Sequence, residues 1–432
     1  MNEAATPNDV CASLTLLARN PTDSVTEGFL PAAARLGLAV TLLTDQPDAH
    51  QAAYERYGCE WRAGGPSAGA LPGRLEIVPC DVRDFRAVIA RIAARAGRVG
   101  RPGAVFTNSD HLQPQAALAA DYFGLPGKDW RAALRTKNKA ELRRGLAAAG
   151  LDTVRCAELA PDDPPDGHGA PHGHGVPYPC VLKPREGVAS EDVFLVADDA
   201  ELAARCREIR ERRPGAVLLL EEYLDGPLHT LETLGDGHTL HPLASFRTDI
   251  SPPPFFVEER LRLLPEPPRP GTDQVLRQLR ALGVGFGACH TEYVDQAGVA
   301  RIIEVNYRAI GDRCDLALAE ALDIPLFELI LRTHLGERLP DTLAARRGTR
   351  VRMEYVCADR AGTLKAAPEA HVQEAGGVRL DYRPLRETGE RHPLYRTNRD
   401  FLGVLRASGD DEGRIDAAVG EFLAAHCWEI VP

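Results

Sequence analysis

Residues 300–312 have the sequence Ala-Arg-Ile-Ile-Glu-Val-Asn-Tyr-Arg-Ala-Ile-Gly-Asp, a short apolar strand that ends in polar groups. Because side chains alternate along a strand, Glu304 and Asn306 share one face. Their oxygens can bind a hard cation such as Mg2+, and Arg308 can reach an anion beside it. Upstream, Asp-Gln-Ala-Gly at 295–298 predicts a hairpin turn, which would put Glu292 and Glu304 on paired strands where they can share metal ions. A hairpin whose polar face merely meets water also fits these residues.

The composition narrows the class of protein. The 432 residues suffice for roughly two to four domains with buried cores. A formal net charge of -11 argues against nucleic acid as a partner. No apolar run approaches the roughly 18 residues of a membrane span, and residues 1–10 lack a signal-peptide pattern, so we expect a cytoplasmic protein without a membrane partner. Ten cysteines without a Cys-x-x-Cys pair indicate reduced thiols.

Lysine is rare in this chain. Only five of the 51 basic residues are lysines, namely Lys128, Lys137, Lys139, Lys183 and Lys365. In a chain so biased toward arginine, each lysine hints at a place where a compact ammonium matters more than a planar guanidinium.

The N-terminal part alternates strands and helices. Apolar runs predict strands at 12–18, 38–44, 75–78 and 104–107, with a helix at 83–96, which together indicate a doubly wound parallel sheet. No glycine follows the first strand, so a dinucleotide-binding fingerprint is absent. Asn108, Ser109 and Asp110 follow the fourth strand, where such sheets bind ligands, and a helix cap fits them equally.

Two lysine-bearing segments suit phosphate. Asn138 is a predicted N-cap for a helix that runs to Gly150, and Lys137 and Lys139 at its start indicate a bound anion, unless that end is simply solvated. Lys183 ends an apolar strand before a loop of small residues, 187–190. Its ammonium and the backbone amides of that loop can hold phosphate oxygens.

The next segment, 216–234, predicts a strand, a short link and a second strand. The link at 221–224 offers an apolar slot and backbone hydrogen bonds for an adenine ring, and Glu222 or His229 can reach ribose hydroxyls. A plain hairpin with solvated acids fits as well.

Other segments carry weaker signals. Residues 160–178 are rich in proline, glycine and histidine and predict an exposed insertion, in which His168, His172 and His174 lack a rigid frame for a metal. A loop at 246–261 holds candidate substrate contacts that can equally be structural; these are Arg247, Phe255, Phe256 and Glu258. Apolar spacing predicts helices at 272–282, 316–335 and 415–426.

In their order along the chain, the Asn138-Lys139 helix, the Lys183 loop, the 221–224 link and the 292–308 hairpin resemble the ATP-grasp superfamily, most closely its branch of L-amino acid ligases and related carboxylate-amine ligases. The resemblance covers nearly the whole chain. It implies an α/β (α+β) fold with a Rossmann-like parallel sheet at 1–130, ATP-grasp subdomains at 131–225 and 226–345, and a closing α+β domain at 346–432.

The resemblance also implies roles for individual residues. The residues implied to bind ATP are Lys139, Lys183, Ser190, Glu221, Glu222, Tyr223, Leu224 and His229. Glu292, Glu304 and Asn306 are implied to bind Mg2+ or Mn2+, and Arg308 acts with Lys183 in catalysis. The chain departs from the pattern at Glu191-Asp192, where relatives often carry a glycine, at Tyr307, where proline is frequent, and at the unfamiliar run 312–315.

The activity so implied is ATP-dependent joining of a carboxylic acid to an amine through an acylphosphate, with release of ADP and phosphate. We expect small-molecule acid and amine substrates, an amino acid among them, in the biosynthesis of a peptide-like natural product or siderophore, and the resemblance allows a homodimer. The alternatives are an ATP-grasp carboxylase or phosphotransferase, or a nucleotide-binding regulatory protein without catalysis.

Overall fold

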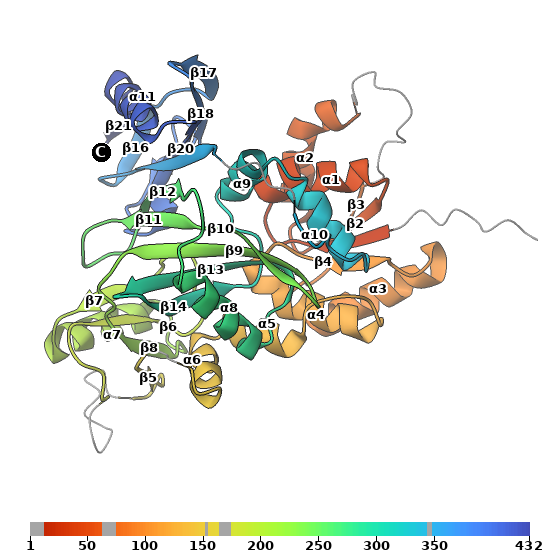
Figure 1. Cartoon of the computed structure of the whole chain (residues 1–432), viewed down its shortest axis with the longest axis horizontal. Helices are drawn as coiled ribbons and strands as arrows, with labels where there is room; N and C mark the ends of the chain where they lie inside the picture. Colours follow the sequence, from red (N-terminus) through yellow and green to blue (C-terminus); the bar gives the residue numbers. More distant parts are fainter. Residues whose placement is uncertain (1–12, 63–74, 152–153, 164–173, 344–347) are drawn as a thin grey trace, which may run out of the picture.

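The computed structural model describes residues 13–62, 75–151, 154–163, 174–343 and 348–432. Figure 1 shows a large antiparallel sheet across the middle of the molecule, with the N-terminal elements on one side of it. A smaller sheet lies below the large sheet in this view, and the C-terminal elements lie above it. Among the described residues, none of the helices has the length and apolar character that a bilayer crossing requires.

The N-terminal sheet is parallel and has helices on both faces. Its strand order is β3-β2-β1-β4, formed by β1 (Ser13–Leu17), β2 (Ala39–Thr44), β3 (Leu75–Pro79) and β4 (Ala104–Phe106). One face packs on η1 (Ser24–Phe29), α1 (Leu30–Arg35) and α10 (Leu326–His334). The other packs on α3 (Phe85–Val99) and α4 (Gln113–Tyr122). The predicted doubly wound parallel sheet is confirmed, and α2 (Pro47–Arg62) and η2 (Asp110–Leu112) complete this part.

The smaller sheet is antiparallel, in the order β5-β8-β6-β7. Its strands are β5 (Cys156–Leu159), β6 (Cys180–Pro184), β7 (Phe194–Val196) and β8 (Leu218–Glu222). Helix α7 (Asp199–Arg212) packs on one face through Leu202, Cys206 and Ile209, all fully buried. Helices α5 (Trp130–Lys137) and α6 (Lys139–Ala148) link this sheet to the N-terminal part.

The large sheet has the order β14-β13-β9-β11-β12-β15-β20-β18-β17, with β10 added to β9. Its first strands are β9 (Leu228–Asp236), β10 (Leu240–Ala244), β11 (Phe246–Ile250), β12 (Glu258–Leu263), β13 (Phe286–Gln296) and β14 (Val299–Asn306). It continues with β15 (Arg350–Cys357), β17 (His371–Ala375), β18 (Val378–Pro384) and β20 (Phe401–Gly409). One sheet therefore runs through both 226–345 and 346–432, and the division into four domains stays a prediction.

The remaining elements cover this sheet. Helix α8 (Gly271–Leu282) packs on β13 and β14, and α11 (Glu412–Ala425) packs on β18 and β20. A three-stranded sheet contains β16 (Gly362–Ala366), β19 (Arg391–His392) and β21 (Glu429–Val431), and η3 (Asn398–Asp400) precedes β20. The predicted helices at 272–282 and 415–426 correspond to α8 and α11.

The predicted hairpin forms, and a β-bulge shifts its register between Glu292 and Tyr293. Strands β13 and β14 pair antiparallel, and Glu292 lies opposite Glu304. The turn between them consists of Ala297 (φ 53°) and Gly298 (φ 86°), and positive φ at both central residues is typical of the type I′ turn that matches the twist of paired strands.

Three sequence predictions need correction. The range 246–261, predicted as a loop, consists mainly of the paired strands β11 and β12, with a loop only at 251–257. The helix predicted at 316–335 is split into α9 (Cys314–Leu322) and α10, because Asp323 adopts a left-handed conformation (φ 54°) and Pro325 follows it. The insertion predicted at 160–178 does contribute to a core at its end, since Val176 is buried in the cluster under the smaller sheet. His168 and His172 lie outside the described residues, and His174 contacts the Tyr178 hydroxyl (3.1 Å).

The N-cap of α6 gives a test of the local fold. The Asn138 side chain accepts hydrogen bonds from the backbone of Ala140 and Glu141, both at 3.1 Å. We expect Asn138→Ala to lower the free energy of unfolding by about 1 kcal/mol, measured by urea denaturation, because two helix amides lose their acceptor. Asn138→Asp keeps an acceptor and serves as the control. Equal stability of the alanine and aspartate variants would contradict the assignment.

Candidate functional site

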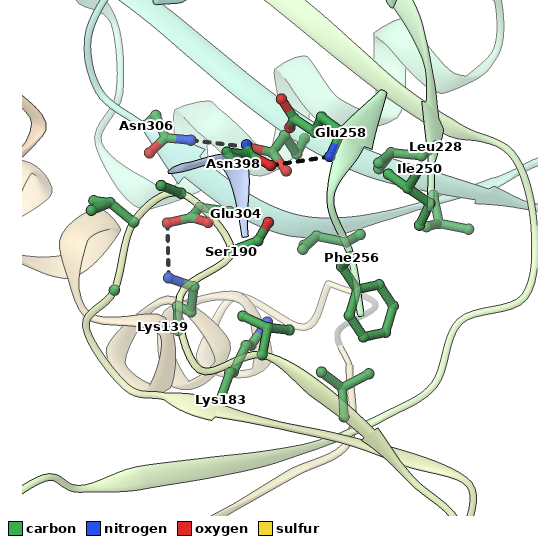
Figure 2. Close-up of a pocket in the computed structure, with 18 of the residues that line it drawn as sticks. Lys139, Lys183, Ser190, Leu228, Ile250, Phe256, Glu258, Glu304, Asn306 and Asn398 are labelled. Atoms are coloured by element: carbon green, nitrogen blue, oxygen red, sulfur yellow. Dashed lines mark hydrogen bonds and ion pairs between the residues drawn. The ribbon is translucent and has the colours of Figure 1, made fainter. Parts of the chain in front are cut away.

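A cavity of about 400 Å³ lies between the smaller sheet and the large sheet. Figure 2 shows residues of both sheets and of α6 turned toward it. All the site residues predicted from the sequence line this cavity except His229; they are Lys139, Lys183, Ser190, Glu221, Glu222, Tyr223, Leu224, Glu292, Glu304, Asn306 and Arg308. Of the candidate substrate contacts, Phe256 and Glu258 line it, and Arg247 and Phe255 do not.

His229 lies on the wrong face of β9 for the predicted contact with ribose. Its neighbour Leu228 lines the cavity, and strand alternation turns His229 to the opposite face. There its ring stacks on Tyr293, with ring centroids 5.6 Å apart, and burial lowers its pKa. The structure therefore gives no support to a ribose contact by this side chain.

The predicted metal ligands meet at one end of the cavity. The Asn306 Nδ2 donates to Glu292 Oε1 (3.2 Å), and Lys139 Nζ donates to Glu304 Oε1 (2.8 Å), as Figure 2 shows for Asn306 and Lys139. Carboxylate and amide oxygens are the donors that Mg2+ prefers. Within the described residues, no group of three or more His, Cys, Asp or Glu side chains is placed to hold a metal. Two carboxylates and an amide therefore fit a cation that completes its shell with phosphate oxygens.

The buried Glu221 carboxylate holds Lys183, the lysine near the end of β6. Glu221 pairs with Lys183 Nζ (2.5 Å) and with Arg143 Nε (2.7 Å). Burial alone would raise the Glu221 pKa, but the two cations outweigh it and lower the pKa to about 2. Burial also lowers the pKa of Lys183, against the attraction of Glu221. Both Glu221 oxygens are thus engaged by cations, so its side chain serves the lysine rather than an adenine ring.

Contacts with two arginines occupy the Glu222 side chain at the end of β8. A ligand beside the link that follows would therefore meet the backbone of the link. Glu222 Oε1 accepts from Arg301 (2.7 Å) and from the backbone amide of Arg155 (2.8 Å), and Oε2 faces the Arg155 guanidinium (3.3 Å). These contacts occupy the carboxylate that was expected to reach ribose. Tyr223 and Leu224 line the cavity between β8 and β9, which is where the sequence predicted an adenine slot.

Beside the predicted metal ligands, the cavity gathers two acids, Glu258 and Asp312, around the Arg308 guanidinium. Arg308 donates to the carbonyl of Ala309 (2.9 Å). Within the described part of the chain, neither the Glu258 nor the Asp312 carboxylate has a hydrogen-bond or ion-pair partner. Burial, together with repulsion from Glu292 and Asp312, raises the Glu258 pKa to about 8, and burial also raises the pKa of Asp312.

His290 is a cavity residue to which the sequence reasoning gave no role. Its Nδ1 lies 2.8 Å from Glu232 Oε1, and its Nε2 lies 3.5 Å from Glu292 Oε1. Burial would lower its pKa, but the two carboxylates outweigh burial and raise the pKa to about 10. An imidazolium therefore supports Glu292. The signal was present, because His290 precedes Glu292 by two residues on one strand and so shares its face.

The N-terminal sheet braces the segment that carries Arg308. Asn108 Oδ1 accepts from the Ala309 amide (3.1 Å), and the buried Lys128 ammonium donates to the Tyr307 carbonyl. The Tyr307 hydroxyl in turn accepts two backbone amides of the β13 entry, at 3.2 and 3.1 Å. The sequence alternatives for 108–110 were a ligand site and a helix cap. Asn108 instead supports this segment, and Asp110 pairs with Lys137.

Curated relatives of this chain include an uncharacterized protein and a ligase. No protein-family model matches the chain. The chain is 27% identical over 379 residues to the uncharacterized protein y4rH of Sinorhizobium fredii, across 83% of this chain and 74% of that protein. It is 31% identical over 156 residues to the phosphoribosylamine–glycine ligase of Streptomyces coelicolor, across 36% of this chain and 35% of that enzyme.

Structure comparison covers the whole chain. The L-amino acid ligase from Bacillus licheniformis superposes with a TM-score of 0.74 and 21% identity, over 98% of this chain and 99% of that one. The biotin carboxylase domain of the Hydrogenobacter thermophilus 2-oxoglutarate carboxylase, in complex with MgADP, superposes with a TM-score of 0.66 and 16% identity, over 97% and 91%. At these identities the likeness shows the fold, which is that of these enzymes.

The buried ion pairs of Glu221 give a stability test. We expect Glu221→Gln to lower the free energy of unfolding by about 3 kcal/mol at neutral pH, because Lys183 and Arg143 lose their counter-charge inside the protein. The folded-state pKa near 2 lies below the ordinary value of 4.5. The carboxylate therefore stabilises the protein fully above pH 4.5, and this contribution disappears as the pH falls toward 2.

Denaturant titrations at pH 7 and pH 3 check this expectation. The difference between wild type and Glu221→Gln should shrink at the lower pH. The matched control is Glu141→Gln on α6, which removes an exposed pair with Arg144 (2.7 Å) and should change stability by less than about 1 kcal/mol. A Glu221→Gln effect no larger than that of the control would show that the buried pairs do not hold the site.

Proposed function

We propose that this chain, which has the ATP-grasp fold, is an ATP-dependent carboxylate-amine ligase. It joins a carboxylic acid to an amine through an acylphosphate and releases ADP and phosphate. The observation that carries the proposal is the content of one cavity: two buried lysines, a hairpin that carries two acids and an amide, and the Arg308 guanidinium, which has no carboxylate partner among the described residues. A protein that only bound a nucleotide would not need this guanidinium.

The nucleotide end of the cavity suits a polyphosphate. Lys183 and Lys139 place two ammonium groups near the 187–190 loop, and the link at 223–224 offers a slot for the base. Glu292, Glu304 and Asn306 would hold Mg2+, which neutralises charge on the phosphates when it is bound. Lys139 is held by Glu304 in this structure, and it would be available to a phosphate oxygen if Glu304 held the cation.

The other end suits a zwitterion. Arg308 can bind a substrate carboxylate, and the unpaired acids Glu258 and Asp312 can bind an ammonium group beside it. A carboxylate and an ammonium held in one small site are the features of an α-amino acid. This arrangement supports an amino acid as a substrate, with a dipeptide or similar amide as the product, of the kind found in peptide natural products and siderophores.

The chemistry follows in two displacements. A carboxylate oxygen attacks the terminal phosphorus of ATP, the bond from that phosphorus to ADP breaks, and an acylphosphate forms. The amine nitrogen then attacks the acyl carbon, the bond to phosphate breaks, and the amine gives up a proton. Lys183 and Arg308 are placed to stabilise the negative charge that gathers in both steps.

The carboxylase alternative shares the fold but fits this cavity less well. A biotin carboxylase domain has the same architecture. In this chain, however, the acids Glu258 and Asp312 stand at the substrate end, where they offer bicarbonate no positive charge. A ligase that takes an amino acid would use these acids to bind its ammonium group.

The substrates can be found by a screen. We expect ADP and phosphate release to rise when the protein meets ATP, Mg2+ and pools of amino acids, and mass spectrometry to find a new amide in the same reactions. ADP release that rises with bicarbonate alone would support the carboxylase instead. If no acid and amine pair stimulates release or yields an amide, the ligase proposal fails.

Two variants test the site assignment. Lys183→Ala and Glu304→Ala should each lower ADP formation by about a hundredfold or more, because phosphate and cation contacts are lost. The control is Lys365→Ala, an exposed lysine paired with Glu429 (3.1 Å) away from the cavity. Full turnover in both site variants would remove the basis for these roles.

A further inference from the structure

The loop between β6 and β7 has an unusual backbone. Residues 187–192 are here called the phosphate loop, and 187–191 line the nucleotide end of the cavity. Three of its non-glycine residues adopt positive φ angles, Ala189 (55°), Ser190 (55°) and Asp192 (60°). Residues with a β-carbon are strained in this region, and such strain persists only where the surroundings hold the backbone in place. The phosphate loop must therefore have external supports.

Part of that support comes from the two arginines at the end of α7. Arg212 lies 2.5 Å from Asp192, and Arg213 contacts both Asp192 (3.3 Å) and Glu191 (2.7 Å). These contacts explain why acids stand at 191–192, where a glycine was expected. They hold Glu191 and Asp192 against the end of helix α7. The tip of the loop, at Ala189 and Ser190, depends on other contacts.

The tip is held by a turn more than 200 residues away in sequence. The backbone amide of Asn398 donates to the Ala189 carbonyl (3.2 Å). The Asn398 side chain accepts from the Glu258 amide of β12 (3.0 Å), as Figure 2 shows, and Arg399 reaches Glu191 (3.3 Å). Asn398 itself lines the cavity. One residue thus ties the phosphate loop of the smaller sheet to a strand of the large sheet.

The turn is built to be rigid. The buried Asp400 carboxylate accepts from His392 (2.9 Å) and from the backbone amides of Tyr395 (2.9 Å) and Arg396 (2.6 Å). Thr397 caps the short helix η3 by accepting from the Arg399 amide (3.2 Å). A turn with this many internal hydrogen bonds can hold a strained loop, because its own backbone is fixed in one conformation.

We propose that residues 395–400 form a latch that holds the phosphate loop closed over the cavity, with Asn398 as its positioning residue. The proposal rests on the proposed function in one respect, that the loop covers phosphate groups. Its consequence is chemical: a loop held closed keeps water from an acylphosphate, so that the amine opens the intermediate instead.

The test uses two substitutions of one residue. Asn398→Pro removes both the amide that contacts Ala189 and the side chain that contacts Glu258. Thr397 is extended (φ -141°, ψ 177°), as a residue before proline must be, and Asn398 is the first residue of η3, where proline is tolerated. Asn398→Ala removes only the contact with Glu258. Lys365→Ala, in the same C-terminal region, is the control.

The first readout needs no turnover. In the ligand-free protein, we expect amide hydrogen exchange at 187–192 to be roughly tenfold faster in Asn398→Pro, less affected in Asn398→Ala and unchanged in Lys365→Ala. MgADP should bind roughly fivefold more weakly to the proline variant. If the proline variant does not fold, the double variant Asn398→Ala/Arg399→Gln, which leaves the backbone intact, carries the same test. Unchanged exchange and unchanged MgADP affinity would overturn the latch.

The second readout separates this proposal from the ligase proposal. With an acid and amine pair that supports turnover, the latch variants should release more ADP per amide formed, because water reaches the intermediate. A wild-type ratio in variants whose loop exchange is also unchanged would overturn the latch and leave the ligase intact. Faster loop exchange in a protein that never forms an amide would support the latch and refute the ligase.

Discussion

A single buried carboxylate, Glu221, connects the elements that surround the cavity. It pairs with Lys183 on β6 and with Arg143 on α6, and Arg143 also donates to the carbonyls of Ile302 (2.6 Å) and Ile303 (2.8 Å) on β14. The smaller sheet, the lysine helix and the cation-binding hairpin are therefore fixed relative to one another through one charge network. Such a network costs desolvation energy, and it persists here because each charge meets a counter-charge or a carbonyl.

The distribution of charge along the cavity follows from this network. Near Glu221 the charges are paired and the geometry is fixed. At the far end Arg308, Glu258 and Asp312 line the same cavity without ion pairs among the described residues. Arg308 and Glu258 are partly exposed and Asp312 is exposed, so a ligand in this end of the cavity can reach all three groups. The N-terminal sheet contributes through Lys128 and Asn108, which hold the backbone on either side of Arg308.

Local patterns in the sequence predicted what depends on local structure. The turn at 295–298 located the hairpin that carries Glu292 and Glu304, and the small residues after Lys183 marked the phosphate loop. The β-bulge that sets Glu292 opposite Glu304 was not predicted. The sequence could not tell that Glu221 serves Lys183, or that His229 faces Tyr293, because these contacts depend on which strands become neighbours. The contacts of Asn398 could not be predicted for the same reason, since its partners Ala189 and Glu258 are far away in sequence.

The central claim is that a carboxylate is activated by phosphorylation in this cavity. The most direct measurement uses an acid substrate labelled with ¹⁸O in its carboxylate and follows the label into the phosphate that is released with the amide. Attack by the carboxylate on ATP transfers one labelled oxygen to phosphate, so the account predicts one ¹⁸O per phosphate formed. Amide formation with unlabelled phosphate would contradict it.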